Sequence, residues 1–224
     1  LAGSIELGAN RRMIKYDVEK GHATLVDTPA VVVLALAATP MPLVEAWCSK
    51  DSELGVVGLK HGREVIRFTK EDDLGKPETI RRAMQAVRTR RGTHVHGAIP
   101  CTPWTSWQRI NLAKAKPETR QRIMDERAQS LEYVSTYCRL ARAAISRGSS
   151  AYFEWPRHCE GWKTQAVMDM IEILGLKHVD VDGCSVGVKS KKGEPILKPW
   201  SFAVSPVHMQ RALDGLRCDG THAH

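Results

Sequence analysis

The stretch LVEAWCSKDSELGVVGLKHGREVIRF, residues 43–68, decides the fold that we expect for this chain. Its first six residues form a short apolar run that suits a buried strand. Its last six residues alternate in polarity, which is typical of a second strand. The segment between them, DSELGVVGLKHG, has room for a short helix or turn. A strand, a helical connection and another strand in this order predict two parallel strands of one sheet.

The same alternation continues after this stretch. We expect further strands over residues 93–100 and 149–156, and helices over residues 76–92, 117–147 and 161–175. Pro77 suits a helix start, whereas Gly148 and Gly175 suit helix ends. The longest helix carries an apolar stripe at helical spacing, which consists of Met124, Ala128, Leu131, Val134, Cys138, Ala141 and Ile145.

The end of the chain predicts an antiparallel pair of strands. Residues 177–188 and 197–205 are strand-like and are joined by the short polar turn KSKKGEP, which is too short for a parallel crossover. Ser205 is expected to cap a last helix that has Pro206 at its first position and runs to about Leu216. The predicted fold class is therefore α/β, with a doubly wound, mostly parallel Rossmann-like sheet that ends in an antiparallel hairpin. This domain spans residues 43–224. Residues 1–42 do not share its alternation of strands and helices and are expected to form an N-terminal extension or linker.

Composition limits the classes of partner. The chain has 224 residues, a net charge of +8 and a pI near 9.3, which favours polyanions and nucleic acid first. Its six cysteines are scattered, so we expect them to be mostly reduced and the protein to be intracellular, nuclear or cytoplasmic. The apolar run AVVVLALAA, residues 30–38, is too short to span a bilayer. Leu1 in place of an initiator methionine suggests a fragment of a longer chain.

Residues that can do chemistry follow the predicted strands. In open α/β sheets, ligands bind beyond the carboxyl ends of the strands. The motif IPCTPW after one strand and the motif FEWPR at the end of the next put one thiol, Cys101, and one carboxylate, Glu154, at neighbouring strand ends. The prolines on both sides of Cys101 present its sulfur instead of packing it.

These motifs resemble the catalytic pair of the DNA (cytosine-5) methyltransferases. In that family a Pro-Cys dipeptide carries the nucleophile and a glutamate at a strand end carries the carboxylate. LVEAWCSKDSELG resembles the family's cofactor loop, EDDL its acidic adenosine contact, and VDGCSVGV with KPWSFAVS its closing hairpin. The resemblance covers roughly residues 43–205 and is greatest to methyltransferase-like domains in polyproteins of protist retroelements and viruses.

The resemblance implies an S-adenosylmethionine-dependent enzyme that methylates cytosine C5. Cys101 would add to C6 of the base, Glu154 would act at N3, and Arg157 would contact the base or a phosphate and help to hold Cys101 as thiolate. The residues implied for the cofactor are Glu45, Cys48, Ser49, Asp51, Ser52, Asp73, Leu74 and Pro100. Those implied for a base that has left its stack are Thr102, Trp104, Trp107, Gln108, Asn111 and Lys198.

Two departures from the family keep other functions open. The cofactor loop has only Gly55 where the family offers several glycines, and the chain has no target-recognition region after the hairpin. Target recognition would then be carried out by residues 1–42 together with the long arginine-rich helix, or by a protein partner. A third alternative is that the substrate is not duplex DNA. The alternatives are a catalytically inactive module that binds nucleic acid or a protein, and a methyltransferase acting on an amino group, for which Cys101 is dispensable. DNA is favoured over RNA.

Each candidate also has a structural explanation. Glu154 could pair with Arg157 on the surface, and Trp155 and Trp162 are expected to pack in the core. The default interpretation of the basic residues is the solvated face of a helix, and these are Arg120, Arg122, Arg127, Arg139 and Arg142. A zinc site would draw on His94, His96, His158 and Cys159, but their spacing is not that of paired cysteines, so no metal is predicted.

Overall fold

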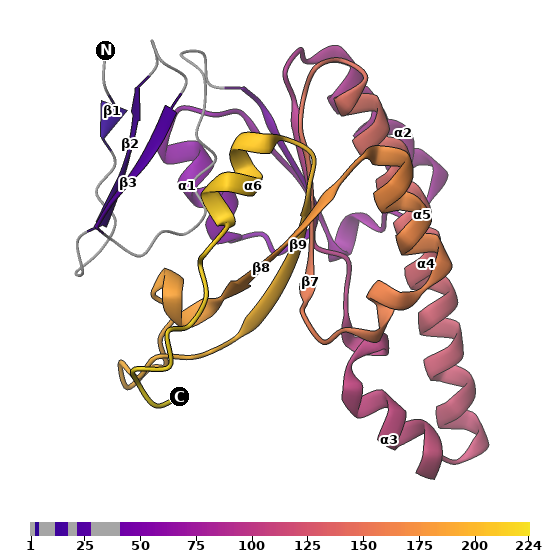
Figure 1. Ribbon diagram of the computed structural model, residues 1–224. Helices are drawn as coiled ribbons and strands as arrows, with labels where there is room; N and C mark the ends of the chain where they lie inside the picture. The colour runs from indigo at the N-terminus through magenta and orange to yellow at the C-terminus, as the bar shows by residue number, and fades with distance from the viewer. Residues whose placement is uncertain (1–2, 5–11, 18–21, 28–40) are drawn as a thin grey trace.

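The computed structural model describes residues 3–4, 12–17, 22–27 and 41–224. Residues 41–224 contain a six-stranded sheet with the strand order β5-β4-β6-β7-β9-β8 (Figure 1). Strands β5, β4, β6 and β7 are parallel, and β9 is antiparallel to both of its neighbours. The strands are β4 (Leu43–Cys48), β5 (Val65–Thr69), β6 (His94–Gly97), β7 (Ala151–Pro156), β8 (Lys177–Asp182) and β9 (Pro199–Val204). The predicted mostly parallel sheet with a closing antiparallel hairpin is confirmed.

Helices cover both faces of this sheet, as expected for a doubly wound fold. Helices α2, α4 and α5 lie on one face, and α1 and α6 on the other (Figure 1). The α-helices are α1 (Glu53–Lys60), α2 (Pro77–Thr89), α3 (Ser106–Lys114), α4 (Pro117–Ile145), α5 (Gln165–Leu174) and α6 (Val207–Leu213). The 3₁₀ helices are η1 (Lys70–Asp72), η2 (Thr102–Trp104), η3 (Glu160–Lys163) and η4 (Gly183–Val186). Among the helices described, none combines the length and the apolar character that crossing a membrane requires.

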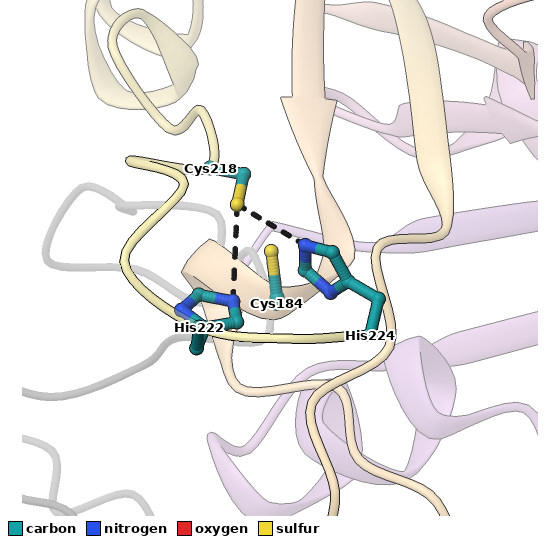
Figure 2. A group of neighbouring side chains, drawn as sticks. All are labelled: Cys184, Cys218, His222 and His224. Carbon is teal, nitrogen blue, oxygen red and sulfur yellow. Dashed lines mark hydrogen bonds between the residues drawn. The ribbon is translucent and has the colours of Figure 1, made fainter.

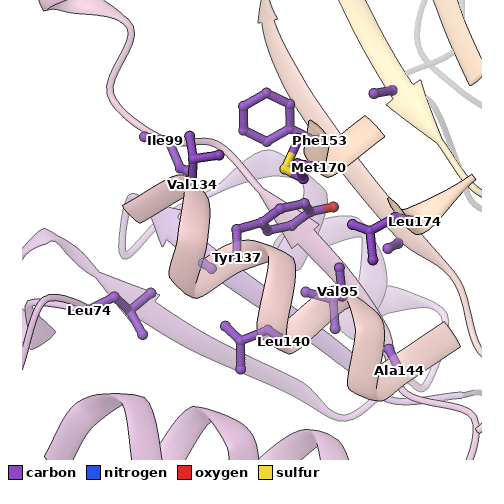
Figure 3. Packing of buried hydrophobic residues seen from close by; sticks show 14 of the residues in the cluster. Leu74, Val95, Ile99, Val134, Tyr137, Leu140, Ala144, Phe153, Met170 and Leu174 are labelled. Carbon is purple, nitrogen blue, oxygen red and sulfur yellow. The ribbon is translucent and has the colours of Figure 1, made fainter. Parts of the chain in front are cut away.

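The main core lies between the sheet and helices α2, α4 and α5. Tyr137 of α4 is fully buried there and packs against Phe153, with 5.3 Å between ring centroids (Figure 3). Gly97, at the end of β6, lies directly under this ring, since a Cβ at that position would be 2.5 Å from the Tyr137 side chain. Burying an aromatic or aliphatic side chain of this kind stabilises the fold by roughly 1.5–3 kcal/mol. The long helix α4 is therefore fastened to the strand that leads into the Cys101 loop.

Three short strands precede the domain. They are β1 (Gly3–Ser4), β2 (Arg12–Asp17) and β3 (His22–Asp27), and they form a separate antiparallel sheet in sequence order. The apolar run at residues 30–38 lies outside the described residues.

The structure corrects three details of the prediction. Helix α3 was not predicted, because its sequence SWQRINLAK has no apolar periodicity. Met124 and Ala128 of the expected stripe are exposed, because the buried face of α4 in its first half is the one that carries Ile123 and Ser130. The last helix begins at Val207 and ends at Leu213; the hydroxyl of Ser205 accepts a hydrogen bond from the Ala151 amide of β7 and does not cap it.

A buried histidine makes the stability of this sheet depend on pH. His94 of β6 is 3% exposed, and its Nδ1 lies 3.0 Å from the hydroxyl of Tyr152. Burial, with the nearby charge of Arg63, lowers the pKa of His94 to about 4. In the unfolded chain this imidazole takes up a proton below about pH 6.5, whereas in the native state it does not, so stability is lost as the pH falls.

We expect the free energy of unfolding to fall by about 2 kcal/mol between pH 7 and pH 4.5 through His94 alone. Urea unfolding at the two pH values measures this change, and the His94→Gln variant should lose that part of it. His158→Gln, which alters an exposed histidine, is the control and should behave as the wild type. An unchanged pH dependence in His94→Gln would contradict the assignment.

Candidate functional site

A cavity of about 570 Å³ opens at the carboxyl ends of the parallel strands, on the face covered by α1 and α6. This volume lies within the range of roughly 300–1,000 Å³ that is usual for ligand pockets. Its polar lining comes mainly from Glu45, Ser49, Ser52, His96, Glu154 and Lys198. Its apolar and aromatic lining includes Trp47, Leu54, Val186, Val188, Trp200, Phe202 and Met209. The cavity therefore joins the predicted cofactor loop to the predicted catalytic carboxylate.

Glu154 stands in the wall of this cavity. Strand alternation turns Phe153 and Trp155 of β7 toward the main core, and Glu154 toward the opposite face. Burial raises the pKa of Glu154, and the ammonium group of Lys198 opposes this rise. A carboxyl group with a raised pKa keeps its proton more readily and can donate it to a nitrogen acceptor.

Cys101 lies close to Glu154 but outside the cavity wall. It follows β6, precedes η2, and is half-buried beside the main core. Burial raises the pKa of Cys101, the charge of Glu154 raises it further, and Lys198 lowers it. Glu154 ends the strand next to β6, from which Cys101 follows, so the thiol and the carboxyl group belong to neighbouring strand ends. The raised pKa also means that the thiol keeps its proton in the free protein, and Lys198 is the cation that favours its loss.

Arg157 does not take the predicted position. Its Nη2 donates a hydrogen bond to Asp182 at 2.6 Å, and its Nε forms an ion pair with Asp180 at 3.1 Å. Both aspartates belong to β8, so the guanidinium is directed toward the hairpin and away from Cys101. The predicted part of Arg157 in holding a thiolate is therefore wrong, and the alternative pairing of Arg157 with Glu154 is not formed either.

The predicted cofactor loop is built on a buried ion pair. The carboxylate of Glu45, 1% exposed, accepts a hydrogen bond of 2.5 Å from the Ser52 hydroxyl and lies 3.4 Å from Nε of Arg67. A Cβ at Gly55 would be 2.2 Å from both Glu45 and Arg67. Gly55 is thus required for the close approach of α1 to this ion pair, and the loop needs its glycine for a structural reason.

Other parts of the loop fit a polar cofactor. Ser49 and Ser52 line the cavity, as does Trp47. Trp47 has φ +60° next to an irregularity in the β4–β5 pairing, and its buried Nε1 has no hydrogen-bond partner among the described residues. The Trp47 ring packs against Tyr133 of α4, with 5.4 Å between ring centroids, so the ring lies on the side of the main core. The volume of the cavity and the hydroxyl groups of Ser49 and Ser52 suit a polar ligand.

The remaining cofactor candidates are spread more widely. Leu74 is 1% exposed in the main core, and Cys48 is buried with its pKa raised to about 12 by burial, so neither is a polar contact. The carboxylate of Asp73 accepts hydrogen bonds from the Gly75 amide and the Tyr133 hydroxyl. Asp73, the exposed Asp51 and the exposed Pro100 lie outside the cavity wall.

The segment that carries Trp104 and Trp107 has one buried and one exposed tryptophan. Trp104 is 7% exposed, its Nε1 donates to the Ser130 hydroxyl at 2.9 Å, and Arg127 stacks on its ring. Its predicted contact with a flipped base is therefore wrong, because the ring is enclosed. Trp107, in contrast, is 72% exposed at the start of α3. It remains free to stack on a base.

The polar residues of this loop bind one another. The side-chain Nε2 of Gln108 donates a hydrogen bond to the Thr102 carbonyl at 3.3 Å, and its Oε1 accepts one from Nδ2 of Asn111 at 3.0 Å. Thr102 is exposed. These residues hold the start of α3 against η2, which supports the loop that presents Trp107. The expected burial of Trp155 is confirmed: it is 1% exposed and its Nε1 donates to the Ile99 carbonyl.

Trp200 and Phe202 were not predicted as cavity residues, and His96 was considered only as a possible zinc ligand. His96 shares a strand with His94 and lines the cavity, and burial lowers its pKa to about 4. Trp200 and Phe202 reach the cavity from β9. Lys198 has φ +30°, and its ammonium group lies 4.6 Å from the centre of the Trp200 ring. Strand alternation in the closing hairpin was the signal that could have identified the two aromatic residues.

The histidines weighed for zinc do not form a metal site. Among the described residues, His94, His96, His158 and Cys159 do not gather with the spacing of metal ligands.

Comparison of the chain with protein-family models, with curated proteins and with solved structures found no match.

Proposed function

We propose that this protein is an S-adenosylmethionine-dependent methyltransferase that acts on nucleic acid, at C5 of cytosine and on DNA in preference to RNA. The observation that supports this function most is that Glu154 and Lys198 line a cavity that also meets the loop after β4, while Cys101 follows the neighbouring strand β6. In a doubly wound sheet this is the edge at which ligands bind.

The grouped residues supply what methylation at carbon needs. The cofactor, when bound, supplies an electrophilic methyl group. The Cys101 thiolate adds to C6 of the base and makes C5 nucleophilic, while the Glu154 carboxyl donates a proton or hydrogen bond to N3. Lys198 stabilises the thiolate before addition. After transfer, a water molecule takes the C5 proton, the C6–S bond breaks to release the Cys101 thiolate, and N3 returns its proton to Glu154.

The exposed arm formed by α3 and the start of α4 is suited to nucleic acid. Helix α3 and the start of α4 project beyond the sheet (Figure 1). Trp107 is exposed on α3, and the basic side chains along the same arm are exposed as well: Lys114, Lys116, Arg120 and Arg122. Aromatic stacking together with phosphate contacts is the usual way of holding single-stranded segments and extruded bases. A protein partner that completes target recognition is also compatible with this surface. The unpaired state of all six cysteines supports an intracellular location.

Cofactor binding is the first test of this function. With S-adenosylmethionine at about ten times its dissociation constant, the native state should gain about 1.4 kcal/mol. For a chain of this size the melting temperature should rise by about 3–6 °C. Ala98→Phe, which fills the cavity, should abolish the rise, whereas Ala128→Phe at an exposed position of α4 should keep it. A melting temperature that is unchanged at millimolar cofactor would contradict cofactor binding.

A second candidate function is a module that binds nucleic acid or protein without catalysis. Two observations favour it: the loop after β4 is occupied by its own ion pair, and burial raises the pKa of Cys101. Such a module would bind an oligonucleotide and transfer no methyl group from labelled cofactor. The cytosine methyltransferase would do both.

A further inference from the structure

Two cysteines and two histidines meet at the carboxyl end of the hairpin strand β8. Cys184 belongs to η4, and Cys218, His222 and His224 come from the last residues of the chain (Figure 2). The four possible ligand atoms all lie within 4.8 Å of one another. The Sγ of Cys218 is 3.8 Å from Nε2 of His222 and 3.2 Å from Nε2 of His224.

The backbone holds these residues together independently of any ligand. The amide of Cys218 donates to the Asp182 carboxylate at 2.9 Å, and Nε of Arg217 donates to the same carboxylate at 3.0 Å. The Leu216 carbonyl accepts hydrogen bonds from the Asp182 amide and the Ser185 hydroxyl, each at 2.8 Å. The C-terminal segment is thus fixed against η4, so that Cys218 faces Cys184.

Neighbouring groups orient the ligands as they do in metal sites. Gly220, with φ +73°, turns the chain so that its amide donates to Sγ of Cys218 at 3.3 Å. An Oδ1 of Asp219 lies 3.7 Å from Nδ1 of His222, which leaves Nε2 of that ring directed at the cluster. A carboxylate behind the remote nitrogen of a histidine is the usual second partner of a metal-bound imidazole.

We propose that Cys184, Cys218, His222 and His224 bind one structural zinc ion. Two sulfur and two imidazole ligands are the set that selects tetrahedral zinc. With bonds of about 2.3 Å to sulfur and about 2.1 Å to nitrogen, the ligands of a tetrahedral site are about 3.4–3.8 Å apart. The observed separations of 3.2 Å and 3.8 Å, and the upper limit of 4.8 Å for any pair, bracket these values, so each separation needs to change by about 1 Å or less. Four protein ligands leave no open position, so the ion would be structural and not catalytic.

The site also fixes one wall of the cavity. Cys184 lies in the same short turn as Val186, and Val186 and Val188 both line the cavity. Zinc would therefore hold this turn and the chain end as one unit beside Glu154 and Lys198. The metal site stands on its own ligands and does not depend on the proposed function.

Metal content of the full chain tests the proposal. Protein prepared with zinc under reducing conditions and then dialysed should carry about one zinc per chain. Cobalt in its place should give the visible bands and the sulfur charge-transfer band of tetrahedral thiolate ligation. In Cys184→Ser, the fraction of chains that carry zinc should fall at least about tenfold. Cys138→Ser, a matched change in α4, should bind zinc as the wild type does.

A second variant distinguishes loss of metal binding from loss of the fold. His224 is the exposed last residue, so His224→Ala should leave the far-ultraviolet circular dichroism unchanged while zinc affinity falls at least about tenfold. Wild-type protein without zinc after reconstitution would overturn the proposal. So would equal zinc affinity in the wild type and in correctly folded His224→Ala, or cobalt spectra without sulfur ligation.

Discussion

Replacing Cys101 by serine is expected to lower the rate of methyl transfer to cytosine by about 10³-fold or more, with cofactor binding unchanged. A serine hydroxyl ionises far less readily than a thiol, so it cannot add to C6 at a useful rate. Because Cys101 lies outside the cavity wall, its loss should leave the rise in melting temperature with S-adenosylmethionine intact. Single-turnover transfer of labelled methyl groups to a cytosine-containing oligonucleotide measures the rate.

The control for this variant is another thiol in the same region. Cys159 is buried, and its charge state is linked to that of Cys101, yet nothing in the proposed chemistry uses it. Cys159→Ala should therefore transfer methyl groups at a rate near that of the wild type. An oligonucleotide with 5-fluorocytosine should form a covalent adduct with the wild type and with Cys159→Ala, but not with Cys101→Ser. If Cys101→Ser keeps full activity, the acceptor is an amino group and the carbon mechanism is rejected.

The fold could be predicted because its signals are local. The apolar run of β4, the alternation of β7 and the glycines at 148 and 175 each act within a few residues, and Gly148 and Gly175 do adopt positive φ. Helix α3 escaped prediction because it has almost no apolar face of its own. The stripe on α4 was assigned one step away from its true buried face in its first half, where Ile123 and Ser130 are buried while Met124 is exposed.

The site was predictable only where topology alone determines position. Cys101 and Glu154 lie at the same edge of the sheet because they follow and end neighbouring parallel strands. The partners of Arg157 and the burial of Trp104 depend on contacts with β8 and α4, which no local pattern encodes. The cysteine and histidine cluster had a local signal in the spacing of Cys218, His222 and His224. Its fourth member, Cys184, is brought in by the hairpin and was not visible from spacing.

The ion pair under the β4–α1 loop provides the largest expected effect on stability. Glu45→Ala removes the partner of Arg67 and leaves a guanidinium, about one-fifth exposed, without its counter-charge. Breaking a buried pair from one side costs about 3–5 kcal/mol, and the partial exposure of Arg67 favours the lower end, about 3 kcal/mol. For a chain of this size the melting temperature should fall by roughly 6–12 °C. Thermal and urea unfolding at pH 7 measure the loss.

A double variant determines whether Glu45 serves the fold or the cofactor. If the loss in Glu45→Ala comes from the unpaired Arg67, then Glu45→Met combined with Arg67→Met should recover most of the stability, because neither charge is then buried alone. A double variant that is no more stable than Glu45→Ala would show that the carboxylate has another structural partner. The cofactor provides a second measurement on the same protein. A stable double variant whose melting temperature still rises with S-adenosylmethionine assigns Glu45 to the fold, whereas one that has lost the rise assigns its carboxylate to cofactor binding as well.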